Sequence, residues 1–146
     1  MDTNLQHSAN GNSVAADSAA LVGRILLALI FIISGYGKIG GYAGTAGYMA
    51  SKGMPMVDVL LPLTILIELG GGLLIAIGWK ARWAAAVIFL FLIPVTLVFH
   101  NPAGLDPALA KQQMIHLLKN VSIMGGMLGL FAFGPGGFSL DAKKST

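Results

Sequence analysis

Glu68 is a single carboxylate in the middle of a long apolar stretch, and it is the sharpest candidate for chemistry in this sequence. Only uncharged residues separate it from Asp58 on one side and from Lys80 on the other. If this stretch crosses a membrane, an ionisable side chain at its centre costs roughly 2.5–3.5 kcal/mol or more. Glu68 must then be protonated, paired with a cation or exposed to water.

Two cations in the first apolar segment, Arg24 and Lys38, are the expected charge partners of Glu68. They belong to a series of positions spaced alternately by four and three, which places both on one face of a helix. At 1.5 Å per residue they are separated by about 21 Å along that helix. Glu68 is therefore expected to approach one of them closely, but not both. Their long side chains could instead reach a head-group region.

A second polar face is predicted in the last apolar segment, where His116, Lys119 and Asn120 have i, i+3 and i+4 spacing. His100 ends the preceding segment on the same side of the membrane, so it is the candidate for the outer mouth of a site. These four residues and Lys38 are expected to converge at one end of a bundle, above the buried carboxylate. Such a funnel could hold the head of a small polar or quinone-like molecule, with His116 or the carboxylate exchanging protons.

Each of these residues also has a purely structural interpretation. Glu68, paired with a cation, could fix the register of two helices. His100 and Lys119 could be interfacial anchors, while His116 and Asn120 could make hydrogen bonds between helices. The sequence leaves these interpretations open beside that of a binding site.

The absence of cysteine excludes several kinds of redox site. Disulfides, iron–sulfur clusters and thiolate zinc sites all require thiols. No metal site is predicted, because His, Asp and Glu residues do not occur at ligand spacing. A haem held by His100 and His116 is disfavoured, since both flank one loop near the same surface. Redox chemistry would thus need an organic cofactor, for which a quinone is the candidate, a haem, or a partner protein.

The composition indicates that lipid surrounds most of the chain. Of the 146 residues, 55% are hydrophobic and only 10% are charged, against roughly 25% charged residues in an ordinary soluble domain. The net charge of +3 comes from Lys and Arg residues scattered at the ends of apolar runs. Because they form no basic stripe, nucleic-acid binding is not expected. They are better explained as topology signals and contacts with anionic lipid.

Four segments meet the requirement of about 20 mostly apolar residues for a membrane-spanning helix. They cover residues 18–39, 55–77, 82–99 and 107–133. Asp106 and Pro107 are suited to the N-cap and first position of the last helix. The glycine-rich residues 40–53 are expected to form a short interfacial segment between the first two helices.

These segments predict an all-α fold, a membrane-spanning antiparallel four-helix bundle, because short connections make neighbouring helices run in opposite directions. Residues 1–17 are expected to be a disordered N-terminal tail. Residues 18–140 would form the transmembrane domain, and residues 141–146 a polar C-terminal tail. Small residues allow close helix contacts in membranes, and Gly125 with Gly129 is a candidate surface, as are residues 70–72.

The distribution of cations predicts the orientation of the bundle. The short connection between the second and third helices carries Lys80 and Arg82 and is therefore expected in the cytoplasm. With four spans, both termini then lie in the cytoplasm, and Lys143 and Lys144 agree with this placement. Lys52 would lie on the opposite side, which is not free of positive charge.

Several short motifs follow one another along the chain: LVGR at 21–24, SGYGK at 34–38, IELGGG at 67–72, GWKAR at 78–82 and HLLKN at 116–120. In this order and at these spacings they resemble the DoxX family of small four-helix membrane proteins. The resemblance covers about residues 20–141. It implies a multi-pass protein of the bacterial inner membrane.

The resemblance also implies a connection with quinones. The family is named for a membrane component linked to terminal quinol oxidase and to thiosulfate:quinone oxidoreductase, and other members are associated with oxidative-stress defence beside soluble enzymes. It implies no list of catalytic residues. A quinone-linked redox subunit with an electron-donating partner is therefore the first hypothesis. The alternatives are a non-catalytic membrane anchor or scaffold for soluble partners, and a small-molecule transporter that would need a homo-oligomer.

Overall fold

The computed structural model describes residues 3–143, with side chains from residue 13 onward. Helices make up most of this part of the chain, and it contains no strand. The elements are α1 (Thr3–Gly40), α2 (Tyr42–Ser51), α3 (Val57–Ile65), η1 (Leu66–Gly70), α4 (Gly71–Ile77), α5 (Ala81–Phe99), α6 (Pro107–Phe133) and α7 (Leu140–Lys143). The predicted all-α fold is therefore confirmed.

Within the described residues, four helical stretches are long and apolar enough to cross a membrane. They are Ser13–Gly40, Val57–Ile77, Ala81–Phe99 and Pro107–Phe133, so all four predicted spans are present. The second span consists of α3, η1 and α4 in direct succession. The expected N-cap of the last helix is also present, because the Asp106 carboxylate accepts hydrogen bonds from the backbone N–H groups of Ala108 and Leu109.

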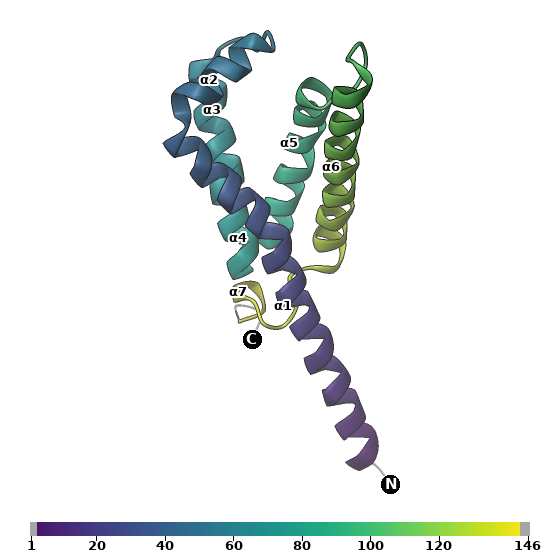
Figure 1. Cartoon of the computed structure of the whole chain (residues 1–146). Coiled ribbons are helices and arrows are strands. Elements are labelled where there is room, and N and C mark those ends of the chain that lie inside the picture. The colour runs from purple at the N-terminus through teal and green to yellow at the C-terminus, as the bar shows by residue number, and fades with distance from the viewer. Residues whose placement is uncertain (1–2, 144–146) are drawn as a thin grey trace.

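Helix α1 begins at Thr3, so the stretch expected to be a disordered tail up to residue 17 is helical from residue 3. Alanine at positions 15, 16, 19 and 20 favours this continuation, since alanine has the highest helix propensity. Asp17 is also held in place, because its Oδ1 accepts a hydrogen bond of 2.6 Å from the backbone N–H of Gly137. The polar N-terminal residues thus extend the first span beyond the bundle (Figure 1).

The long helices lie side by side and follow the chain back and forth, which is compatible with the expected antiparallel arrangement (Figure 1). Helix α1 packs against η1 and α4, α4 packs against α5, and α5 packs against α6. Buried apolar side chains fill the shared core, among them Ala28, Phe31, Ile75, Ile88 and Met127. Helix α2 lies at the end of the bundle opposite the two termini, in agreement with the interfacial segment expected there (Figure 1).

Glycine permits the close contact between α1 and the second span. A Cβ atom added at Gly35 would lie only 2.8 Å from the backbone nitrogen of Leu69, and one at Gly72 would lie 2.9 Å from the Ile32 side chain. By contrast, a Cβ atom at Gly125 or Gly129 would meet nothing within 4 Å. The contact surface predicted around residues 70–72 is therefore present, whereas the one predicted in α6 is not used within this chain.

The C-terminal segment folds back under the bundle. The Asp141 carboxylate accepts hydrogen bonds from the backbone N–H groups of Lys80 (2.8 Å) and Ala81 (3.0 Å) at the start of α5. The Asp141 N–H in turn donates to the carbonyl of Gly78, the residue that ends α4. The segment expected to be a polar tail therefore begins as a docked turn, and residues 144–146 lie outside the described part of the chain.

Candidate functional site

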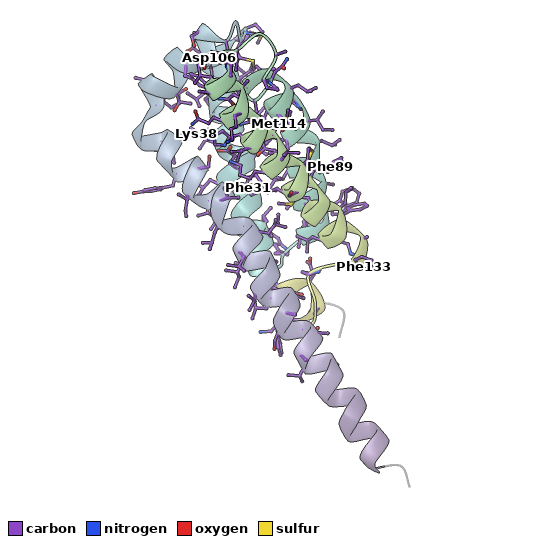
Figure 2. All side chains as sticks on the ribbon, turned by 45° about the vertical axis from the view of Figure 1, so that its right-hand side comes forward. Phe31, Lys38, Phe89, Asp106, Met114 and Phe133 are labelled. Carbon is purple, nitrogen blue, oxygen red and sulfur yellow. The ribbon has the colours of Figure 1, made fainter. Side chains whose placement is uncertain are left out.

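Glu68 is buried, with 7% of its surface exposed, and forms an ion pair with Lys38. The distance from Lys38 Nζ to Glu68 Oε2 is 2.7 Å, and Lys38 Nζ also donates to the Ser34 hydroxyl at 2.6 Å. Figure 2 shows Lys38 in the upper half of the bundle, above Phe31, on the side of α1 that faces the other helices. Of the two predicted charge partners, Lys38 is thus the one that meets the carboxylate.

Glu68 sits in η1, a turn of π-helix between α3 and α4. A π-helical turn has i→i+5 hydrogen bonds, is rare in proteins and often marks a functional site. The turn lies where α1 approaches most closely, since Gly35 faces the backbone of Leu69. The wider turn and the nearby glycine together place the carboxylate against the end of α1.

Arg24 does not pair with Glu68, and Lys38 is the one of the two candidate cations that does. The Arg24 side chain is 4% exposed and lies at the other end of the bundle, where it binds backbone carbonyls. It donates to Ala76 at 3.2 Å, to Pro135 at 2.6 Å and to Phe138. These carbonyls come from the ends of α4 and of the C-terminal segment, so Arg24 joins three parts of the chain.

The polar residues of the upper half line one cavity of about 250 Å³. It is enclosed by side chains of α1, α2, the second span, α5 and α6. Its polar lining includes five of the predicted site residues: Lys38, Glu68, His100, Lys119 and Asn120. Its apolar lining is rich in aromatic rings, with Phe31, Tyr48, Phe91 and Phe99. Of the five residues expected to converge at this end of the bundle, four line the cavity together with Glu68, whereas His116 does not.

Asn120 and Lys119 are neighbours with different surroundings. Asn120 is buried, and its amide nitrogen donates to the Thr96 hydroxyl of α5 at 3.0 Å. That hydroxyl donates in turn to the carbonyl of Leu92 at 2.6 Å. Among the described residues, Lys119 has no carboxylate within 4.0 Å, whereas Lys38 is paired. The cavity consequently holds one neutralised ion pair and one ammonium group without a counter-charge.

The two histidines at this end of the bundle are in contact. The rings of His100 and His116 have centroids 5.2 Å apart and an interplanar angle of 32°. His100 Nδ1 also shares a hydrogen bond of 2.9 Å with the Gln113 side chain. His100 lines the cavity, whereas His116 contacts the ring of His100 from α6 and is not part of the lining. The two rings touch and leave no room between them for a haem.

Several residues of the site were not predicted. Ser34, Tyr48, Thr64, Thr96 and Gln113 carry polar groups in or beside the cavity. Of these residues, only Gln113 could have been predicted from the sequence, since it precedes His116 by three positions and so shares its helix face. Within residues 13–143, no group of three or more His, Asp or Glu side chains could hold a metal ion.

Comparison with known proteins agrees with the features described above. The DoxX family model matches residues 19–101, which is more than half of the chain. The chain belongs to the DoxX family. The match includes Arg24, Lys38, Glu68 and His100, and it ends before α6.

Two related proteins of Escherichia coli (strain K12) resemble this DoxX-family chain along most of their length. The inner membrane protein YqjF is 40% identical over 125 residues, which cover 86% of this chain and 91% of YqjF. The inner membrane protein YphA is 35% identical over 123 residues, which cover 84% of this chain and 88% of YphA. No solved structure matches the chain. With four apolar helices and these relatives, it is a multi-pass protein of the inner membrane.

Proposed function

We propose that this DoxX-family protein binds the head group of a quinone in the cavity between its helices, as the membrane subunit of a quinone-linked redox system. The observation that carries the proposal is the ion pair between the buried Glu68 and the half-buried Lys38, both of which line a cavity with aromatic rings in its walls. A carboxylate in a membrane helix is costly and is by default functional. Here its position is fixed by an unusual turn of the helix.

The lining suits a planar ring with carbonyl oxygens. Phe31, Phe91 and Phe99 offer apolar surface for the ring. Lys119, which has no counter-charge, can donate to one carbonyl oxygen, and the Lys38 ammonium can donate to another. Charge-assisted hydrogen bonds of this kind are about twice as strong as neutral ones.

Reduction of a quinone to a quinol takes up two electrons and two protons. The Lys38–Glu68 pair provides groups that can exchange protons at the ring oxygens. Asn120 would orient the ring from α6, while His116 would act by positioning His100. The electrons would come from a redox partner, since this chain has no cysteine to hold an iron–sulfur cluster of its own.

The orientation of the protein is part of the proposal. The connection between α4 and α5, next to Lys80 and Arg82, lies at the same end of the bundle as α7 (Figure 1). An excess of cations marks the cytoplasmic side. The cavity would then lie in the outer half of the membrane. A quinone bound there would exchange protons with the outer side.

The proposal is tested by thermal unfolding of the purified protein with a short-chain quinone. Wild type, Glu68→Gln and the control Asp58→Asn are compared, because Asp58 is exposed and lies outside the cavity. A ligand at 100 times its Kd stabilises a protein by about 2.7 kcal/mol. We expect a concentration-dependent rise in Tm for wild type and Asp58→Asn, and none for folded Glu68→Gln. If no variant is stabilised, the quinone site is refuted, and a scaffold for soluble partners becomes the better explanation.

A further inference from the structure

A second cavity adjoins the proposed head-group site. It has a volume of about 260 Å³ and lies between the loop after α2, the helix α3 and the outer half of α5. Its own lining is wholly apolar and comprises Met54, Leu60, Leu63, Ile67, Pro94 and Val98. The quinone head group and the proton exchange proposed above involve only the first cavity, so they assign no occupant to this second one.

The two cavities adjoin each other. Five residues line both of them: Met49, Thr64, Phe91, Val95 and Phe99. Thr64 lies one turn before Glu68 on the second span, so the shared wall begins next to the buried carboxylate. A molecule whose polar head lies against the ion pair would therefore have an apolar space directly beside it.

The apolar cavity also reaches the surface that faces the bilayer. Leu63 on α3 and Val98 on α5 line it from opposite sides, and they are 46% and 37% exposed. Both belong to stretches that are apolar enough to span the membrane, so their exposed parts contact lipid chains. The apolar cavity thus lies between the exposed surface of the two helices and the polar site.

We infer that the ligand is an amphiphile with a long apolar tail, which enters from the bilayer and leaves its tail between α3 and α5. This inference rests on the proposed quinone function and specifies its substrate class as a tailed, membrane-dissolved quinone. A water-soluble ring would leave the second cavity without an occupant. Because lipid chains are as apolar as the cavity, the tail is selected by packing and shape, with little hydrophobic gain.

The test compares one benzoquinone ring with and without a decyl chain, in nanodiscs of phosphatidylethanolamine and phosphatidylglycerol. Both ligands are supplied at equal mole fraction in the lipid, so that partitioning into the bilayer does not contribute. Leu63→Trp and Val98→Trp each fill the apolar cavity from one wall. Val59→Trp is the matched control, since Val59 is exposed on α3 and lines neither cavity.

We expect wild type and Val59→Trp to bind the tailed ring about tenfold more tightly than the bare ring, a difference of about 1.4 kcal/mol. Leu63→Trp and Val98→Trp should abolish this difference while binding the bare ring as wild type does, which also shows that they are folded. Equal affinity of wild type for the two rings would overturn the inference and leave the quinone site standing. A phospholipid chain that occupies the apolar cavity would give the same result. If wild type binds neither ring, the proposed function itself fails.

Discussion

Lys38 Nζ and Glu68 Oε2 are 2.7 Å apart, and this ion pair joins the end of α1 to the π-helical turn of the second span. It links a carboxylate and an ammonium group that come from two different membrane-spanning helices. Removing one member of a buried pair leaves an uncompensated charge, which costs far more than removing both. The pair therefore gives the first prediction.

Lys38→Met should lower the free energy of unfolding by on the order of 3 kcal/mol, since the Glu68 carboxylate loses its cation. Adding Glu68→Gln should restore much of this loss, because the double variant has no unpaired charge at this position. Thermal or denaturant unfolding in mild detergent measures both values. Lys52→Met is the control, as Lys52 is exposed and lies over the Tyr48 ring at 5.6 Å. Simple additivity of the two changes would show that the residues are not coupled.

Lys119 should affect binding more than stability. It lines the cavity without a carboxylate partner, so Lys119→Met removes a hydrogen-bond donor and breaks no ion pair among the described residues. We expect the affinity for a short-chain quinone to fall about tenfold, with unfolding changed by less than about 0.5 kcal/mol. Titration in detergent measures the affinity. Lys111→Met, near the start of the same helix, should leave it unchanged, and equal effects of both variants would indicate a general charge effect.

Arg24 should be a structural residue. Arg24→Gln leaves carbonyls of Ala76, Pro135 and Phe138 without their donor, and we expect a loss of about 2–3 kcal/mol. The C-terminal segment should also become accessible to carboxypeptidase in membrane vesicles. Arg82→Gln is the matched control, because Arg82 also donates to two carbonyls but is exposed. If Arg24→Gln kept its stability and lost quinone binding, the structural role assigned to Arg24 would be wrong.

Gly35 should tolerate no side chain. In Gly35→Ala the new Cβ atom would approach the backbone of Leu69 to 2.8 Å, so α1 must shift, at a cost of about 1–3 kcal/mol. Gly125→Ala meets open space and should be neutral, or should stabilise α6 by up to about 1 kcal/mol. Unfolding curves compare the two variants. A large loss in Gly125→Ala would instead reveal contact of α6 with a second copy of the chain.

Reporter fusions test the orientation. A fluorescent protein that matures only in the cytoplasm, fused after Thr146, should be bright, while alkaline phosphatase at the same place should be inactive. Inserted in the connection between α5 and α6 at residues 100–106, the two reporters should behave in the opposite way. The reverse pattern would place the cavity in the cytoplasmic half of the membrane.

Four helical spans of a membrane protein could be predicted from the amino-acid sequence alone. A bilayer satisfies no backbone hydrogen bonds, so apolar stretches of sufficient length must be helices, and their ends follow from local signals. Asp106 caps α6, and Gly78 ends α4 in the left-handed conformation with a φ of 70°. Helix periodicity also placed Lys119 and Asn120 on one face, and both line the cavity.

Which cation pairs with Glu68, and which groups Arg24 contacts, could not be predicted and became known from the three-dimensional packing. Both cations lie on one face of α1, and the choice depends on the depth and rotation of the second span against that helix. A π-helical turn and the contact at Gly35 set this register, and neither has a sequence signal. The same applies to the apolar cavity, whose walls come from α3 and α5. Local sequence fixes a helix and its faces, whereas relative placement arises from packing between distant segments.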